Sequence, residues 1–513
     1  MKVFLMFKDR DFDLHQKLPP NGEALIQDLE LNTLFNTMAS GDNFLFNVAK
    51  VAILSSLTDI ETILYRQDIL KDCLKNPSTV KDMYDIAVES IESVKKTFFG
   101  FFNRYIVGML DSSIQAMKLL VDTLKKLRKI ADDRSDDFNS EGFKRFFGMI
   151  EEELSDEYFK IIERHLNTLE FRDGVLISAE LGRGNKGKNY VLRKPNHEKK
   201  SWIGRILPQK THGYSFRIAD RDENGAKALS ELKERGLNSV ANALTQSVNH
   251  ILDFFNILRT ELAFYIGALN LHDQLVKIEE PICFPLPVSH LKRERVFKEL
   301  YDPCLALTLK RKIVGNDLEL NNKNLFIITG ANQGGKSTFL RSVGLSQLMM
   351  QCGMFAPAKS FSANVCKGLF THYKREEDIT MKSGKFDEEL KRMNDIVENL
   401  TANSTVLFNE SFSATNEIEG SEIARQIVSA LLEKHIEVFF VTHMYEFAHD
   451  FYEKQLRDAA FLTAERKENG DRTFKIIEGK PLSTSYGKDL YDNIFKSKAT
   501  ADKEKDEYSK TKI

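Results

Sequence analysis

The fold of the C-terminal half is decided by the stretch Leu325-Phe-Ile-Ile-Thr-Gly330-Ala-Asn-Gln-Gly-Gly335-Lys336-Ser337-Thr338. It begins with an apolar run, as in a buried strand, and continues as the phosphate-binding loop (P-loop) G-x-x-x-x-G-K-[ST], which leads into a helix. In such a loop the backbone N–H groups face phosphates, the lysine reaches the β/γ oxygens and the serine hydroxyl ligates magnesium. The alternative is a chance glycine-rich turn. The stretch predicts an ATP and Mg²⁺ site formed by Gly330, Asn332, Gly334, Gly335, Lys336, Ser337 and Thr338, with Ser337 as a metal ligand.

Two further strands end in polar residues. The run Thr405–Phe408 is followed by Asn409 and Glu410, and the run Val438–Val441 leads to His443. We expect Asn409 beside the magnesium ion, Glu410 as the general base that orients and deprotonates the attacking water, and His443 as a sensor of the γ-phosphate. The alternatives are a capping pair after a strand and an ordinary polar residue at a strand end.

The spacing of apolar residues predicts several domains in this 513-residue chain. Apolar residues recur three and four apart before residue 166 and again from Val240 to Leu269, as in helices. Short β-like runs lie between them, ending near Tyr214–Ile218, and the proline-rich segment Pro281–Pro287 interrupts the second helical stretch. We expect an N-terminal segment 1–24, an α-helical domain 25–166, a β-rich basic insertion 167–220, a long return helix 221–280, an α/β P-loop domain with a largely parallel sheet 281–490 and a disordered tail 491–513.

The overall composition argues against several classes of protein. With 42% hydrophobic residues and 73 basic against 75 acidic side chains, neither whole-chain disorder nor a generally basic surface is indicated. The five cysteines show no metal-ligand spacing, and we interpret them as reduced core thiols. No run approaches the roughly 18 apolar residues of a membrane helix, and charges interrupt the N-terminal apolar residues. We expect a cytoplasmic protein that does not enter a membrane.

One segment of the nearly neutral chain is strongly basic. Between Arg183 and Lys210 there are nine basic residues and one acid, Glu198, with Trp202 and Tyr190 among them. Lysine and arginine neutralise phosphates, and aromatic rings stack on exposed bases. The alternative is a solvated basic hairpin without a ligand. The candidate nucleic-acid residues are Lys186, Lys188, Arg193, Lys194, Lys199, Lys200 and Arg205.

Several motifs, in order along the chain, resemble the MutS family of DNA mismatch-repair ATPases, a branch of the ABC class. The segment Thr329–Arg341 is similar to the family's Walker A motif, with its extra asparagine and double glycine. Leu57–Asp68 resembles the start of the family's helical core, and Val314–Asp317 resembles the strand pair before the P-loop. Phe355–Ala358 resembles the element after the P-loop helix. Asn409–Gly420 resembles the Walker B and signature segment, and Val441–His443 resembles the histidine motif.

This resemblance implies an architecture and partners. It implies a helical core and lever domain, a DNA clamp at the basic insertion, and an ABC-type ATPase domain. It also implies a homodimer in which Thr415 and Asn416 of one subunit act on the γ-phosphate in the other.

The sequence departs from the family pattern in three places. The helical core begins near residue 25, so we expect a short member without the N-terminal mismatch-reading domain. The usual Walker B aspartate is Asn409, which is neutral and predicts a weaker magnesium site and slow hydrolysis. The signature segment Ser411–Thr415 lacks the family's usual glycine and arginine.

These observations predict an ATP-dependent DNA-binding clamp of the MutS type, acting on mismatched or otherwise structured DNA. One alternative is an RNA- or ribosome-remodelling ATPase on the same scaffold. The other is an ATP switch that hardly hydrolyses and acts on a protein partner. The basic insertion disfavours the switch, whereas Asn409 favours it.

Overall fold

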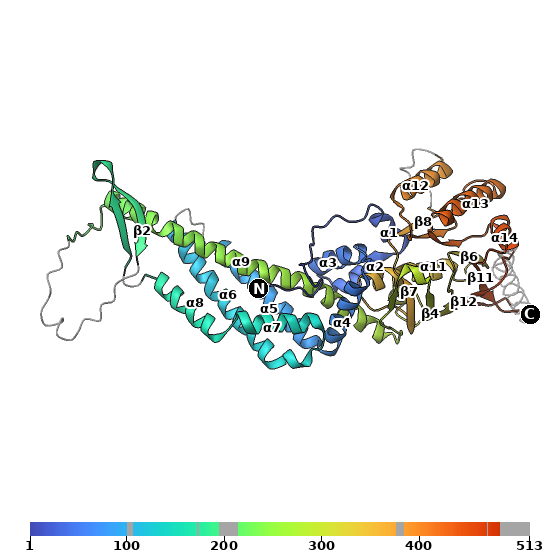
Figure 1. Cartoon of the computed structure of the whole chain (residues 1–513), viewed down its shortest axis with the longest axis horizontal. Helices are drawn as coiled ribbons and strands as arrows, with labels where there is room; N and C mark the ends of the chain where they lie inside the picture. The colour runs from blue at the N-terminus through green and yellow to red at the C-terminus, as the bar shows by residue number, and fades with distance from the viewer. Residues whose placement is uncertain (100–105, 172–173, 194–213, 376–383, 469, 483–513) are drawn as a thin grey trace, which may run out of the picture. The chain divides into compact units, whose positions relative to one another are not determined.

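The computed structural model describes residues 1–99, 106–171, 174–193, 214–375, 384–468 and 470–482. Their contacts divide the chain into two compact units (Figure 1). The helical unit comprises Met1–Val3, Ser78–Asn139 and Phe143–Arg259, and the sheet unit comprises Phe4–Pro77, Ser140–Gly142 and Thr260–Ile513. The predicted disordered tail, 491–513, lies outside the described residues.

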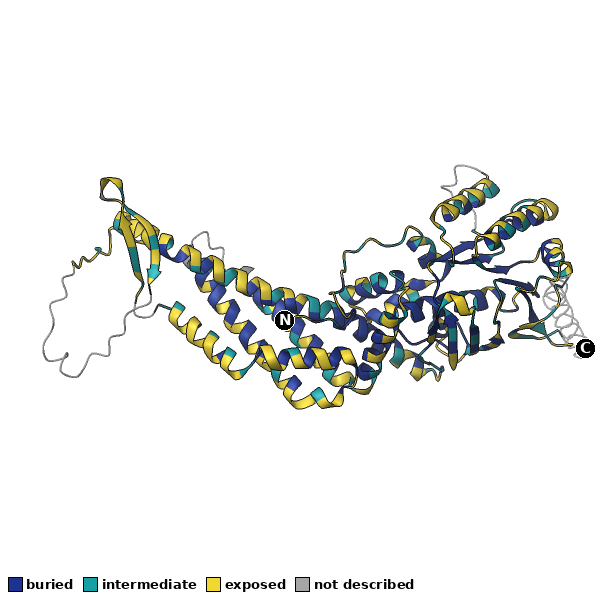
Figure 2. Ribbon diagram, in the orientation of Figure 1, coloured by how far each residue is buried: buried dark blue, intermediate teal, exposed yellow. Residues whose placement is uncertain are grey.

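Amphipathic helices make up most of the helical unit. They are α5 (Pro77–Phe99), α6 (Ile106–Arg134), α7 (Glu141–Glu153), α8 (Asp156–Leu169) and the first part of α9 (Glu223–Lys277). Apolar residues spaced three and four apart in α6, such as Leu120 and Leu124, are buried, while the opposite helix faces are exposed (Figure 2). Helices predicted from this periodicity are confirmed, including the long return helix.

A short antiparallel hairpin, β1 (Leu176–Leu181) and β2 (Gly187–Arg193), follows α8. It packs on the first part of α9, where a Cβ at Gly236 would lie 2.5 Å from Cδ1 of Ile177. A side chain at position 236 would therefore displace that of Ile177. The prediction that β structure extends to Tyr214–Ile218 is wrong, because these residues form no strand. Their alternating apolar pattern meets no partner strand among the residues that the structure describes, and Tyr214 is fully exposed.

The sheet unit is built on a six-stranded sheet in the order β12-β11-β6-β10-β9-β8. All neighbouring strands are parallel except β11 and β12. The strands are β6 (Leu325–Gly330), β8 (Leu369–Tyr373), β9 (Thr405–Asn409), β10 (Glu437–Val441), β11 (Ala459–Arg466) and β12 (Arg472–Glu478). The largely parallel sheet and its three predicted strands are confirmed. Because β6, β9 and β10 are parallel, the residues that follow them meet at one edge.

Helices cover both faces of this sheet. The helices α12 (Lys385–Asn399), α13 (Glu417–Glu433) and α14 (Tyr445–Glu453) share a buried cluster with Val406 and Phe408 of β9. The intervening residue Leu407 points to the other face, since successive side chains of a strand alternate. On that face, Leu407 packs against Gly344 of α11 (Lys336–Gln351): a Cβ added at Gly344 would lie 2.8 Å from Cδ1 of Leu407.

The rest of the sheet unit is a second sheet and several short helices. The four-stranded sheet has the order β3-β7-β4-β5. Its strands are β3 (Leu286–Val288), β4 (Arg295–Leu300), β5 (Asn316–Glu319) and β7 (Ser360–Asn364), and the helices are α1 (Gly22–Asp28), α2 (Leu31–Ala39), α3 (Asn43–Leu54), α4 (Ile60–Lys75) and α10 (Pro303–Leu309). Within the described residues, no helix combines the length and the apolar content needed to cross a membrane.

The division into units differs from the boundary that we expected at residue 25. Residues 4–77 belong to the sheet unit rather than to the helices that follow them. The cause is contact with α11: the backbone N–H of Leu57 donates to the carbonyl oxygen of Gln351 across 2.9 Å, and Leu29 packs beside Gly344. Local periodicity predicts these helices but cannot predict against which part of the chain they pack.

Candidate nucleotide-binding site

The P-loop connects β6 to α11 and is shaped by its glycines. Gly330 and Gly335 have φ values of 110° and 90°, a region that favours glycine. A Cβ at Gly334 would lie 2.8 Å from the carbonyl oxygen of Ala331. The loop therefore needs these residues to fold tightly. Gly335 ends the loop as the N-cap residue of α11, so the helix N-terminus faces the loop.

Lys336 is the buried cation of this loop, with 5% of its surface exposed. Its Nζ donates to the carbonyl oxygens of Gly330 and Ala331 across 2.9 and 3.0 Å. Burial lowers the pKa of the ammonium group; the Glu410 carboxylate opposes this shift and the Arg472 guanidinium adds to it. A buried ammonium group held by two neutral carbonyls fits an anionic ligand such as a phosphate chain.

Ser337 lies next to the end of β9. Its Oγ donates a hydrogen bond to Oδ1 of Asn409 across 2.9 Å. The two predicted magnesium ligands are thus brought together, and both present oxygen atoms, which Mg²⁺ prefers. The pair is neutral, so these two side chains would hold the ion without the charge of a carboxylate.

Glu410 and His443 follow neighbouring strands, and Oε2 of Glu410 lies 4.0 Å from Nδ1 of His443. Glu410 has a φ of 53°, in the left-handed region that costs a residue with a side chain about 1–2 kcal/mol. The backbone N–H of Glu410 donates to the carbonyl oxygen of Val441 across 2.9 Å, which ties this turn to β10. The turn therefore holds the carboxylate near enough to the P-loop lysine to oppose the lowering of the lysine pKa.

His372 supports the same turn from β8. Its ring is buried and stacks on Phe412, with ring centres 5.2 Å apart. Its Nε2 lies 3.0 Å from the carbonyl oxygen of Glu389 and its Nδ1 lies 2.7 Å from Oγ of Ser411, whose hydroxyl also contacts the carbonyl oxygen of His372 as a donor. Burial lowers the pKa of His372 to about 4. The ring is therefore neutral near pH 7, and sequence reasoning did not identify it.

The predicted signature residues lie at the start of α13. Thr415 donates to the Glu419 carboxylate across 2.8 Å, and the side chain of Asn416 caps the helix by accepting from the Glu419 N–H. In the described part of the chain, no hydrogen bond joins either residue to the P-loop of the same chain. Ile418 beside them is 77% exposed.

The hairpin of β11 and β12 contacts the P-loop, and sequence reasoning missed it. Ala464 pairs with Gly330, and its Cβ would lie 2.7 Å from a Cβ at Gly334. Nε of Arg472 donates to the carbonyl oxygen of Asn332 across 2.6 Å. Phe474 lies beside Gly335, with its carbonyl oxygen 3.4 Å from where a Cβ would be. No motif marks these residues, because their contacts arise from pairing between distant strands.

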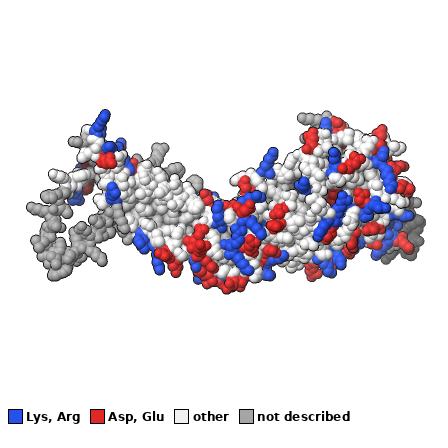
Figure 3. Space-filling view, in the orientation of Figure 1, with Lys and Arg blue, Asp and Glu red and all other residues white. Residues whose placement is uncertain are grey.

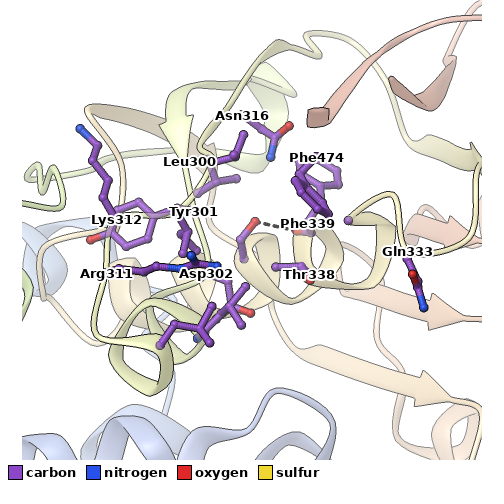
Figure 4. A pocket seen from close by; sticks show the side chains of 16 residues that line it. Leu300, Tyr301, Asp302, Arg311, Lys312, Asn316, Gln333, Thr338, Phe339 and Phe474 are labelled. Atoms are coloured by element: carbon purple, nitrogen blue, oxygen red, sulfur yellow. Dashed lines mark hydrogen bonds between the residues drawn. The ribbon is translucent and has the colours of Figure 1, made fainter. Parts of the chain in front are cut away.

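A cavity of about 590 Å³ opens beside the P-loop (Figure 4). This volume is typical of small-molecule sites. The residues around it come from the end of β4, α10, the segment between α10 and β5, β5, the P-loop, α11 and β12. They include the aromatic side chains of Tyr301, Phe339 and Phe474, the polar side chains of Asn316, Gln333 and Thr338, and the charged side chains of Asp302, Arg311 and Lys312. Thr338, predicted as a nucleotide contact, thus lies between the P-loop and the cavity.

The basic residues of the β1–β2 hairpin are exposed. Lys186, Lys188 and Arg193 present their side chains to solvent, although Arg193 donates to Ser178 Oγ across 2.9 Å and Lys188 lies 3.5 Å from Glu180. Figure 3 shows lysine and arginine side chains together with acidic ones on the visible face of this hairpin. The other predicted nucleic-acid residues, Lys194, Lys199, Lys200 and Arg205, lie outside the described residues.

A strand, a tight glycine loop and a buried lysine at the start of a helix, on a largely parallel sheet, define the P-loop class of α/β folds. Two family models match the chain: one described as the MutS2 N-terminal domain covers residues 58–278, and one described as MutS domain V covers residues 326–500. The chain belongs to the MutS family.

Individual relatives agree with this assignment. The chain is 24% identical over 485 residues to the DNA mismatch repair protein MutS of Lactobacillus acidophilus, covering 84% of this chain and 54% of that protein. It is 30% identical over 288 residues to MutS protein homolog 4 of Homo sapiens, covering 54% of this chain and 30% of that protein. The match to MutS of Clostridium novyi is 27% over 274 residues, 50% of this chain and 30% of that protein. The chain thus spans about half or less of the length of these relatives.

Proposed function

We propose that this chain is an ATPase of the MutS type that couples ATP binding and slow hydrolysis to the binding of nucleic acid. The observation that carries this proposal is the assembly of Lys336, Ser337, Asn409, Glu410 and His443 at the ends of three parallel strands. The named relatives, two of them DNA mismatch repair proteins, support the same reaction class.

Each side chain has a defined task in this proposal. Lys336 and the loop N–H groups bind the phosphates, and Ser337 and Asn409 are the residues that would hold magnesium, which supplies positive charge against the phosphate oxygens. Glu410 orients a water molecule and accepts its proton, and His443 contacts the γ-phosphate from β10. Because Asn409 carries no charge, we expect hydrolysis to be slow.

The cavity beside the P-loop is the proposed site of the nucleotide base. It adjoins Gly335 and Thr338, so a base placed there continues directly from phosphates bound at the loop. The aromatic rings of Tyr301, Phe339 and Phe474 offer the apolar surface that a purine requires. Figure 4 shows them on the two sides of the cavity.

A homodimer would complete the nucleotide site. Thr415 and Asn416 lie at the exposed start of α13, and their hydrogen bonds are to Glu419. The neighbouring Ile418 offers exposed apolar surface for a subunit contact. In this proposal the two residues reach the γ-phosphate of the other subunit, and ATP binding closes the dimer.

The exposed basic hairpin is the proposed nucleic-acid contact, and DNA is the favoured ligand because the named relatives act in DNA mismatch repair. An RNA- or ribosome-remodelling ATPase would use the same charges. The neutral Ser337–Asn409 pair favours a third candidate, a switch that binds ATP, hardly hydrolyses it and acts on a protein partner.

Binding of duplex DNA, branched DNA and structured RNA to the purified chain, each with and without ATP, tests the proposal. We expect ATP to change the affinity for at least one DNA structure and to leave structured RNA more weakly bound. Tighter binding of RNA would favour the remodelling ATPase. An absence of nucleic-acid binding, with ATP bound, would favour the protein-partner switch.

A further inference from the structure

A second cation lies beside the P-loop, and the proposed mechanism gives it no task. Arg472, the first residue of β12, donates from Nε to the carbonyl oxygen of Asn332 across 2.6 Å. Its Nη2 atom is buried and makes no hydrogen bond to any residue that the structure describes. The charge of Arg472 also contributes to the lowered pKa of Lys336. Two cations therefore lie close enough to repel each other in the absence of an anion.

The position of Arg472 is set by the sheet rather than by a mobile side chain at the surface. β11 pairs with β6 so that Ala464 lies opposite Gly330, and Arg466 of β11 pairs with Arg472 of β12. Phe474, two residues further on, packs against Gly335 at the start of α11. The hairpin is thus held against the P-loop on both sides of Arg472, and its guanidinium group is fixed at the loop.

The chemistry of the guanidinium group indicates what its free donor binds. Buried N–H groups are rarely left without an acceptor, and those of arginine match phosphate oxygens in geometry and charge. The nearest ligand site is the P-loop, whose glycines and lysine suit a phosphate chain. We propose that Arg472 is a second phosphate-binding cation of the nucleotide site and that its Nη2 donates to the phosphate chain of the bound nucleotide. This inference rests on the proposed function.

The same charge has a consequence for the metal. Asn409 would give the magnesium site no negative charge, so in the proposed function the protein would hold the ion weakly. Arg472 places a permanent positive charge near the phosphates, which offsets part of what magnesium would supply. We therefore expect the affinity for ATP to depend less on Mg²⁺ than it would if Lys336 were the only cation at the phosphates. Arg472 should contribute most to this affinity when Mg²⁺ is absent.

Calorimetric titration of the full chain with ATP, in excess Mg²⁺ and in EDTA, tests this inference. Arg472→Gln should weaken ATP binding in EDTA by about tenfold or more, the value of a charge-assisted hydrogen bond, and by less in Mg²⁺. Arg472→Lys, which keeps the charge, should retain more affinity than Arg472→Gln. The matched control is Arg466→Gln, which removes an arginine of the same hairpin that donates to Lys467. It should bind ATP like the parent.

The outcomes separate the possibilities. Unchanged affinity of Arg472→Gln in EDTA overturns the inference. Equal losses in Arg472→Gln and Arg472→Lys also overturn it, because they would show that the side chain only clamps the loop through Asn332. If Arg472→Gln does not fold, Arg472→Met, which keeps the apolar stem, replaces it in the same comparison. Lys336→Ala is titrated in parallel. If this variant binds ATP as tightly as the parent, the P-loop site itself is refuted. If Lys336→Ala loses affinity for ATP but Arg472→Gln does not, only the role of Arg472 is refuted.

Discussion

Ser337 and Asn409 are joined by a hydrogen bond of 2.9 Å from the serine hydroxyl to the amide oxygen, so the P-loop and the end of β9 meet through a neutral pair. An aspartate at this position would place a carboxylate where the structure has an amide. In the proposed magnesium site, two oxygen atoms would thus face the ion without the negative charge of a carboxylate.

Asn409→Asp should tighten the magnesium site and raise turnover. The new carboxylate would face the Ser337 hydroxyl and attract the cation, whereas the amide offers only a dipole. Titration of ATP turnover with Mg²⁺ measures the effect, and we expect half-saturation at a lower Mg²⁺ concentration. Asn43→Asp, which adds the same charge at an exposed position at the start of α3, should not change it. An unchanged Mg²⁺ requirement in Asn409→Asp would separate Asn409 from the metal.

Glu410→Gln should abolish most of the hydrolysis and leave ATP binding intact. Glutamine keeps the shape of the side chain but cannot accept a proton from water, so turnover should fall by roughly 10²-fold or more. Steady-state phosphate release and ATP titration on the same preparation measure the two quantities. Glu446→Gln, an exposed change in α14, should behave like the parent. Equal turnover in the parent and Glu410→Gln would show that Glu410 is not the base.

Neutralising the basic hairpin should weaken nucleic-acid binding and flatten its dependence on salt. For every phosphate that the protein no longer neutralises, the negative slope of log K against log salt should move towards zero by about 0.7–0.9. The combined change of Lys186, Lys188 and Arg193 to glutamine tests the described part, and a second variant at Lys194, Lys199, Lys200 and Arg205 tests the remainder. A control with Lys298, Lys367 and Lys434 changed to glutamine removes three exposed charges of the sheet unit. The control should keep the parent slope. If both variants of the basic residues also keep it, these residues do not contact phosphates.

The buried His372 should make the β8–β9 region less stable in acid. Its pKa is about 4 in the folded protein and near 6.5 when unfolded, so the unfolded state binds more protons between these values. Stability should therefore be complete above pH 6.5 and fall as the pH drops towards 4, by at most about 1.4 kcal/mol per pH unit. Hydrogen exchange of β8 and β9 amides at several pH values measures it.

His372→Gln should flatten this pH dependence, since glutamine does not titrate. The matched control is His449→Gln, at a half-exposed histidine of α14, which should retain the parent's dependence. An identical loss of protection in acid for His372→Gln and the parent would mean that another group is responsible.

The sequence predicted well those elements whose pattern is local. The run from Leu325 is continuously apolar because β6 is central and buried on both faces, and the glycine spacing defines the loop that follows. The return helix was predictable because its apolar residues recur at a helical period over many turns. Asn409, Glu410 and His443 could be placed together because parallel strands end at the same edge of a sheet.

What escaped prediction depends on contacts between distant residues. Arg472 reaches the P-loop only because β11 pairs with β6 and then turns back as β12, a pairing that no local pattern specifies. Nothing in the sequence distinguishes His372 from the other residues of its strand. That it supports the turn after β9 is evident only from its burial against Phe412. Tyr214–Ile218 shows the opposite case, an alternating apolar pattern that forms no strand with any described residue.

The central claim, that the P-loop binds the phosphates of ATP, is tested most directly by calorimetric titration of ATP into the parent and Lys336→Ala. Lys336 is the buried cation of the loop, and alanine removes its charge-assisted contact, worth about 1.5–3 kcal/mol or roughly 10- to 100-fold in affinity. We expect micromolar-range binding in the parent to weaken by at least about tenfold in the variant. ATP bound equally well by both proteins would contradict the assignment of this loop as the nucleotide site.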